Sequence, residues 1–202
     1  NCPDDEEHEL FKLPAFVNTL MENKWLGSKS GQGFYKKAKD ENGKSQILGL
    51  ELKTLAYRKG KRATFPTLEL TKNIANVIDL FKVLVVGKDK AGEFYRKNFS
   101  LMFSYVSKRI PEISDELYKI DDAMKAGFGW ENGPFEIWDA VGIEKGIELM
   151  KAIGKEPAAW VSEMLASGIT SFYTIKDGAT YYYNIPQKKH LKVPGQDAFI
   201  IL

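Results

Sequence analysis

The sequence has few of the residues that usually carry metal or redox chemistry. Its 202 residues include a single cysteine, Cys2, and two histidines, His8 and His190. One cysteine cannot form an internal disulfide, so the chain does not need an oxidising compartment and a cytoplasmic location is expected. One cysteine and two distant histidines also lack the spacing of a metal centre, so no metal site is predicted.

Long apolar runs and an excess of one charge are also missing. No stretch of eighteen apolar residues occurs, which argues against a membrane-spanning helix. Lysine and arginine total 29 against 27 aspartates and glutamates, so neither a nucleic-acid nor a membrane partner is predicted. Hydrophobic residues at 44% and charged residues at 28% are typical of a folded chain, with enough length for one domain or two small ones.

Helical patterns dominate what is present. Apolar residues recur at helical spacing over residues 16–21 and again over residues 90–109. Pro134 follows Gly133 where the first turn of a helix tolerates proline, so these two residues predict a helix start. Residues 172–183 contain a glycine-bearing turn between aromatic runs and predict a β-hairpin. The pattern as a whole predicts a mainly α fold with a small hairpin.

The chain also contains an internal repeat. The apolar pattern of residues 16–21 recurs over residues 160–165, and Gly33-Phe34-Tyr35 recurs as Ser171-Phe172-Tyr173. The second copy lacks a counterpart of residues 26–31, so the spacing between the copies changes at that point. Each copy consists of a helix, a loop, a Phe-Tyr pair and a polar turn, and is predicted to end one repeated unit.

Two segments carry a resemblance to a known family. Residues 9–35 resemble the closing segment of the C-terminal domain of 3-hydroxyacyl-CoA dehydrogenases, and residues 120–139 resemble the middle of the same domain. The motifs that carry it are Trp25-Leu26-Gly27-Ser28-Lys29-Ser30-Gly31-Gln32-Gly33-Phe34-Tyr35 and Gly127-Phe128-Gly129-Trp130-Glu131-Asn132-Gly133-Pro134-Phe135. The resemblance implies a helical bundle similar to the C-terminal domain of 6-phosphogluconate dehydrogenase.

The resemblance also implies a function in fatty-acid β-oxidation. This family oxidises a 3-hydroxyacyl-CoA to the 3-ketoacyl-CoA by hydride transfer to NAD. In its fused members, an NAD-binding domain precedes two helical domains and an enoyl-CoA hydratase domain follows them. The expected partners are therefore the acyl-CoA substrate and those two domains. The second helical unit is expected to close the substrate cleft in place of a partner subunit, and a homodimer is a further expected assembly.

The repeat and the resemblance together predict the domain organisation. Residues 1–56 are expected to be the terminal part of a first C-terminal-type domain, and residues 67–184 a complete second one. Residues 57–66 are predicted to be a basic linker, and residues 185–202 a linker towards a following domain. The first residue is not methionine and the last five are apolar, so the sequence is expected to be a piece of a longer chain.

Catalytic residues are not expected on this chain. Hydride transfer to NAD needs a base of near-neutral pKa beside the nicotinamide, and the family uses a histidine oriented by a glutamate. The neighbours of His8 do not match that catalytic segment, and His190 lies beyond the second unit. No G-x-G-x-x-G fingerprint is present either, so NAD is expected to bind to a domain outside this chain.

The loop of residues 27–33 is the most suggestive candidate for a binding site. Its glycines could let backbone amides approach an anion, and Lys29 adds positive charge. A CoA phosphate or an interdomain carboxylate is therefore one predicted ligand, with Lys29, Gly31 and Gly33 as the substrate or cleft-loop residues. The alternative, which we favour, is a tight turn that packs Phe34 and Tyr35.

Other polar and aromatic features are interpreted as structural. Asp121 and Asp122 are adjacent on a predicted helix, so they point in different directions and are expected on a solvated face. An aromatic series is expected in the core: Trp130, Phe135, Trp138 and Trp160. Two other functions stay open at this stage, a non-enzymatic helical interaction module and a nucleic-acid binder that uses the basic residues 58–62.

Overall fold

The computed structural model describes residues 4–61 and 63–196, and it divides into two compact units. Residues 1–63 form the first unit and residues 64–202 the second. Cys2, Arg62 of the basic segment and the apolar residues 198–202 lie outside the described residues. Each unit is described separately below.

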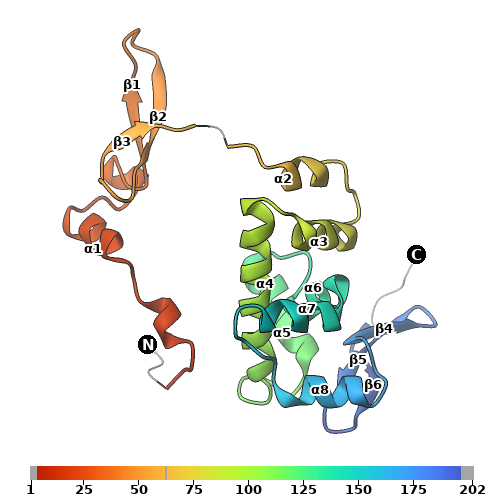
Figure 1. Ribbon diagram of the computed structural model, residues 1–202. Coiled ribbons are helices and arrows are strands. Elements are labelled where there is room, and N and C mark those ends of the chain that lie inside the picture. The colour runs from red at the N-terminus through yellow and green to blue at the C-terminus, as the bar shows by residue number, and fades with distance from the viewer. Residues whose placement is uncertain (1–3, 62, 197–202) are drawn as a thin grey trace. The chain divides into compact units, whose positions relative to one another are not determined.

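The first unit is a short helix followed by a three-stranded sheet (Figure 1). Its strands pair antiparallel in the order β1-β2-β3. The elements are η1 (His8–Phe11), α1 (Ala15–Glu22), η2 (Ser28–Ser30), β1 (Tyr35–Lys39), β2 (Ser45–Leu50) and β3 (Tyr57–Lys59). The first residues of the expected linker 57–66 therefore belong to the sheet, because Tyr57 pairs with Leu50 and its ring packs on Trp25.

The second unit is a bundle of helices followed by a second three-stranded antiparallel sheet (Figure 1). The mainly α fold with a small hairpin is therefore confirmed. The helices are α2 (Pro66–Thr71), α3 (Val77–Val86), α4 (Lys90–Lys108), α5 (Leu117–Phe128), α6 (Pro134–Val141), α7 (Ile143–Lys151) and α8 (Ala159–Ala166). The strands are β4 (Tyr173–Lys176), β5 (Ala179–Asn184) and β6 (Lys189–Lys192).

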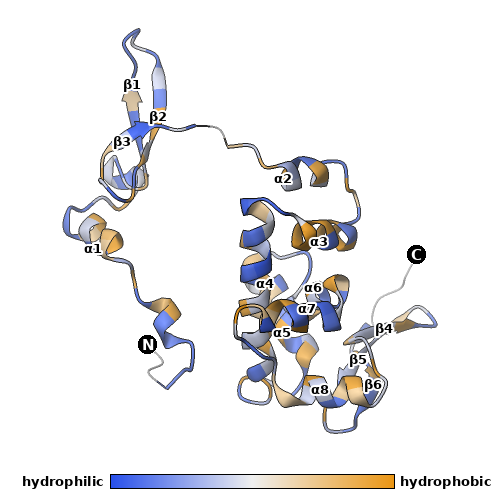
Figure 2. Cartoon of the chain, viewed as in Figure 1, coloured by the Kyte–Doolittle hydropathy of each residue, from blue (hydrophilic) through white to orange (hydrophobic). Residues whose placement is uncertain are grey.

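Aromatic side chains fill the core of the second unit. Helix α4 packs on α6 and α7. Helix α3 also packs on α6 and is mostly hydrophobic, as its orange colour in Figure 2 shows. At the centre the rings of Phe103 and Trp138 stack with centroids 4.9 Å apart, and Phe172 meets Trp138 edge-on at 5.1 Å. These three side chains are fully buried. Of the aromatic residues expected in the core, Trp130 is the exception, because it is 38% exposed.

The ends of the helices follow local capping chemistry. Helix α4 begins after Asp89, whose carboxylate accepts hydrogen bonds from the amides of Gly92 at 3.0 Å and Thr67 at 2.8 Å. The bond from the Thr67 amide contributes most to holding the pKa of Asp89 below its usual value. Helix α6 begins at Pro134, as Gly133-Pro134 predicts.

The repeat found in the sequence is also present in the structure. In each unit one helix leads through a loop into a three-stranded antiparallel meander. The Leu50 amide donates to the Phe34 carbonyl at 2.9 Å, and the Tyr183 amide donates to the Phe172 carbonyl at 2.7 Å. The two closing segments, α1 with β1–β3 and α8 with β4–β6, thus share one backbone pattern.

The third strand of each meander is fastened by an equivalent hydrogen bond. The Tyr57 hydroxyl donates to the Gly33 carbonyl at 2.6 Å, while Nε2 of His190 lies 3.1 Å from the Ser171 carbonyl. Gly33 and Ser171 are equivalent residues of the repeat. The sequence predicted a hairpin only over residues 172–183, and it did not predict the third strand of either meander, because that strand is short and carries polar residues.

Candidate functional site

The loop of residues 27–33 is closed by its own hydrogen bonds. The Gly27 amide donates to the Gln32 carbonyl at 2.9 Å, and the Gly31 amide donates to the Ser28 carbonyl at 3.2 Å. The hydroxyl of Ser30 accepts from the Leu26 amide at 2.9 Å. These three amides are already used within the loop, so the backbone amides of Gly27 and Gly31 are not free to bind an anion in this conformation.

Gly31 and Gly33 have structural reasons to be glycine. Gly31 adopts a φ of 83°, in the left-handed region that glycine occupies without strain. A Cβ on Gly33 would lie 2.8 Å from the Cα and the nitrogen of Gly27, so only glycine permits this close approach. The predicted tight turn is therefore present. It leaves Phe34 half exposed and Tyr35 71% exposed, so neither aromatic side chain is packed away as expected.

Lys29 is the remaining chemical feature of the loop. It lies on η2 at the solvent-exposed rim of a hollow of about 520 Å³ that is lined by Leu26, Ser28, Lys29 and Ser30. The hollow is open to solvent and shallow. Among residues 4–61 and 63–196, no carboxylate forms an ion pair with Lys29. The loop can therefore offer one cationic side chain to an anionic ligand.

The two histidines lie in different surroundings. His8 is on η1, where its Nε2 is 2.8 Å from the Glu9 carboxylate, but both side chains are largely exposed. His190 is on β6 and is engaged with the Ser171 carbonyl, with its ring edge-on to Tyr183 at 6.2 Å. A base for hydride transfer works in a closed site from which water is excluded. The His8–Glu9 pair is exposed, and the expectation that neither histidine is catalytic stays a prediction.

A buried carboxylate, Asp121, organises the centre of the second unit. It lies on α5 with no exposed surface, and it accepts hydrogen bonds from the amides of Phe135 and Glu136 at the start of α6, at 2.9 and 3.1 Å. The Tyr173 hydroxyl of β4 donates a third bond at 2.8 Å. The expectation of a solvated face is thus wrong for Asp121, because the N-terminus of another helix is directed at it. Asp122 is exposed, as expected.

A second carboxylate, Asp139, anchors the meander to the bundle. It lies on α6, and its two oxygens accept hydrogen bonds from the amides of Phe172 and Tyr173, both at 2.8 Å. The bond to Tyr173 holds the start of β4, and that to Phe172 orients a fully buried ring. The sequence analysis missed Asp139, although an aspartate next to the core residue Trp138 is a signal that could have identified it.

The carboxyl groups of Asp121, which is fully buried, and Asp139, which is partly buried, predict an unusual pH dependence of stability. Burial is the main cause that raises the pKa of Asp121 and of Asp139 from 3.8 to about 7, and their hydrogen-bond donors oppose the shift. Between pH 3.8 and about pH 7, these two carboxyl groups therefore bind more protons in the native protein than in the unfolded chain. The free energy of unfolding should therefore fall as pH rises from about 5 to about 7, by at most about 1.4 kcal/mol per pH unit for each group.

Chemical denaturation of the chain and of Asp139→Asn across this pH range tests that prediction. The variant should show a shallower pH dependence, because one of the two titrating groups is removed. An unchanged slope, or stability that increases with pH over the same range, would contradict the assignment of this titration to Asp139.

Metal and membrane features are not found in the described part of the chain. Within residues 4–61 and 63–196 no three histidine, cysteine or acidic side chains gather as metal ligands. Over the same residues no helix combines the length and apolar character that crossing a bilayer requires. Among the polar groups that the fold brings together are the hydrogen-bond network of Asp121, Asp139 and Tyr173 and the serines of α4, which bond the segment of residues 156–160.

The fold and this network define a class of protein: a helical domain that ends in a three-stranded meander anchored by a buried carboxylate. Comparison with known proteins gives the family. Residues 102–184 match the family model of the 3-hydroxyacyl-CoA dehydrogenase C-terminal domain. Over these residues the chain is similar to the 3-hydroxyacyl-CoA dehydrogenase C-terminal domain, and the resemblance seen in the sequence is confirmed.

Curated relatives agree with this family. A "Probable 3-hydroxyacyl-CoA dehydrogenase" of Bacillus subtilis is 38% identical over 189 residues, which cover 94% of this chain and 23% of the relative. A "Putative fatty acid oxidation complex trifunctional enzyme" of Rickettsia felis is 25% identical over 133 residues, which cover 66% of this chain and 17% of the relative. The chain thus spans about a quarter or less of these relatives. No solved structure gives a significant match.

Proposed function

We propose that this chain is the non-catalytic helical portion of an NAD-dependent 3-hydroxyacyl-CoA dehydrogenase of fatty-acid β-oxidation. The whole enzyme would transfer a hydride from the substrate's hydroxyl-bearing carbon to NAD, while a base takes the hydroxyl proton. The match of residues 102–184 to the C-terminal domain of this family carries the proposal. The names of the Bacillus and Rickettsia relatives support it.

In this proposal the helical units close the substrate cleft and position neighbouring domains. Closure would exclude water from the active site, and positioning would fix the geometry of the reacting groups. NAD would be held by another domain, because a dinucleotide site uses a parallel sheet. The sheets formed by residues 4–61 and 63–196 are antiparallel. Fused NAD-binding and enoyl-CoA hydratase domains are proposed partners, and the name "trifunctional enzyme" of the Rickettsia relatives supports such a fusion. We also propose a cytoplasmic location and, as one assembly, a homodimer.

The chain alone is therefore expected to be inactive. Incubation with NAD and a 3-hydroxyacyl-CoA should produce no NADH above the rate without protein. A control with the whole Bacillus subtilis relative reports whether the assay detects the reaction. Production of NADH by the chain alone would contradict the non-catalytic assignment.

The loop of residues 27–33 is the proposed contact for the CoA moiety, through Lys29 next to Gly31 and Gly33. Replacing Lys29 with alanine should weaken CoA binding about two- to five-fold, the effect of losing one exposed ion pair. Isothermal titration of CoA into the chain and the variant measures this change. Lys44→Ala is the matched control, because Lys44 is also exposed and the net charge changes equally.

A second ligand shows which phosphate is involved. If Lys29 contacts the ribose phosphate of CoA, dephospho-CoA should bind equally to the chain and to Lys29→Ala. Equal CoA affinity of the chain and Lys29→Ala, or no CoA binding, would remove Lys29 from the proposed contact.

A further inference from the structure

The sheet of the first unit carries two lysines on a side that faces solvent in both copies of the repeat. Lys36 of β1 and Lys59 of β3 lie opposite each other across β2, and both are exposed. Their equivalents in the second unit, Thr174 and Lys192, lie opposite each other across β5 and are also exposed. The second unit includes its helices, so the exposure of this side is a property of the domain with its bundle in place.

Lys36 is held beside the loop of residues 27–33. Its Nζ lies 5.4 Å from the centroid of the Tyr57 ring, in a cation–π contact. The Tyr57 hydroxyl donates to the Gly33 carbonyl at 2.6 Å, and the Tyr57 ring packs on Trp25 with centroids 5.8 Å apart. The contact therefore directs the ammonium group of Lys36 towards the loop.

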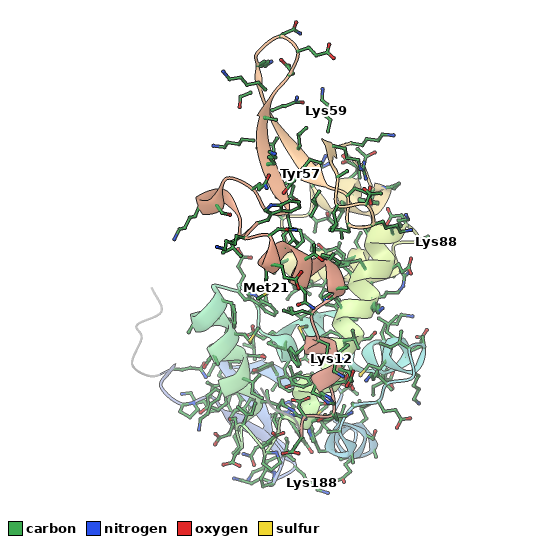
Figure 3. The ribbon with its side chains drawn as sticks, turned by 90° about the vertical axis from the view of Figure 1, so that its left-hand side faces the viewer. Lys12, Met21, Tyr57, Lys59, Lys88 and Lys188 are labelled. Atoms are coloured by element: carbon green, nitrogen blue, oxygen red, sulfur yellow. The ribbon has the colours of Figure 1, made fainter. Side chains whose placement is uncertain are left out.

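Alternation along β3 separates the charges of the two sides of the sheet. Tyr57 and Lys59, both labelled in Figure 3, are two residues apart and point to the same side. Arg58 lies between them and points to the opposite side, and its guanidinium pairs with Glu51 at 2.6 Å. In the part of the chain that the structure describes, no carboxylate forms an ion pair with Lys36 or Lys59. Both lysines are available to an anion.

The number and spacing of these lysines suit a small ligand with a few phosphate groups. Neighbouring strands are about 4.8 Å apart, so Lys36 and Lys59 are separated by about 10 Å at the backbone, and their long side chains can converge on one ligand. A nucleic acid is commonly held by about six to ten phosphate contacts, more than this side offers. CoA carries a diphosphate and a 3′-phosphate on one adenosine, and Lys29 of the adjoining loop is its proposed contact.

We propose that Lys36 and Lys59 form a phosphate-binding site for CoA on the solvent-facing side of the first sheet, next to the loop that carries Lys29. Each ammonium group would pair with a phosphate oxygen of the adenosine end. The inference rests on the proposed function, because CoA is the part of the substrate that supplies these phosphates. It extends the proposed contact from one lysine to three.

Isothermal titration of CoA into the full chain at low salt tests this site. Replacing both Lys36 and Lys59 with alanine should weaken CoA binding about four- to twentyfold, the combined effect of losing two exposed ion pairs. The matched control replaces Lys37 and Lys39, which are exposed on the same strand but alternate to the opposite side. This control removes the same net charge and should leave the affinity unchanged.

Two further ligands identify the phosphate. Pantetheine has none, so it should bind the chain and the Lys36/Lys59 double variant equally. Dephospho-CoA lacks only the 3′-phosphate. If the double variant also weakens dephospho-CoA, the site binds the diphosphate, and if it weakens CoA alone, the site binds the 3′-phosphate.

The proposal is overturned if the two double variants lose affinity equally, since general charge attraction would then account for the binding. It is also overturned if only Lys29→Ala weakens CoA, or if a DNA oligonucleotide binds the chain more tightly than CoA does. Absence of CoA binding would remove all three lysines from the contact. The non-catalytic assignment is decided separately by NADH production, so its failure is distinguishable from that of this site.

Discussion

Replacing Asp121 with alanine is expected to lower the free energy of unfolding of the second unit by about 3–5 kcal/mol. The carboxylate is fully buried and accepts the amides of Phe135 and Glu136 and the hydroxyl of Tyr173. Alanine would leave these donors buried without an acceptor and would open a cavity next to Gly133. Three elements, α5, α6 and β4, would lose their common contact.

Chemical denaturation followed by tryptophan fluorescence measures this effect, since Trp138 and Trp160 lie in the same unit. Asp122→Ala is the matched control, and it should change stability by less than about 0.5 kcal/mol because Asp122 is exposed. Asp121→Asn should fall between them, because an amide keeps the volume and one acceptor oxygen. Equal effects of Asp121→Ala and Asp122→Ala would show that the network contributes little.

The second large effect is expected at Phe172. Phe172→Ala should cost about 3–5 kcal/mol, because the ring is fully buried between Phe135 and Trp138 and its removal leaves a cavity. The internal repeat offers a matched control in Phe34→Ala. Phe34 has the same place in its meander but is half exposed, so its replacement should cost less than about 1.5 kcal/mol.

Scanning calorimetry of the full chain and both variants distinguishes the two positions. Phe172→Ala should shift the transition of the second unit, and Phe34→Ala should leave that transition in place. If Phe34→Ala destabilised the chain as much as Phe172→Ala, the Phe34 ring would be buried in solution.

Much of the fold could be predicted from the sequence because local rules agree with it. Helix α1 covers Ala15–Glu22, where the apolar spacing predicts a helix, and α4 ends at Lys108, within one residue of the expected end. The Phe172-Tyr173 pair correctly marked the start of the predicted hairpin, since β4 begins at Tyr173. Strands β3 and β6 were not predicted, because each is short and pairs with a neighbour that only the tertiary fold brings alongside.

The polar network could not be predicted by the same rules. Helical geometry correctly separates Asp121 from Asp122, but it does not tell which of the two faces the core. That choice depends on the N-terminus of α6, fourteen residues further along the chain. The role of Asp139 depends in the same way on the start of β4, whose amides lie 33 and 34 residues further along the chain. For the loop of residues 27–33, the glycines correctly indicated a turn. The internal use of its amides depends on the carbonyls of Ser28 and Gln32 and on the hydroxyl of Ser30, which only the folded loop brings into place.

The hydrogen bonds of Asp139 and Asp121 also bear on the rate of folding. They join residues 33 to 34 positions apart for Asp139 and 52 positions apart for Tyr173 with Asp121. Within the bundle, the Ser104 hydroxyl donates to the Glu156 carbonyl across the same separation of 52 positions. Closing such long loops costs entropy before the contacts that they allow can form. We therefore expect the second unit to fold more slowly than a helical bundle of similar length whose contacts are local.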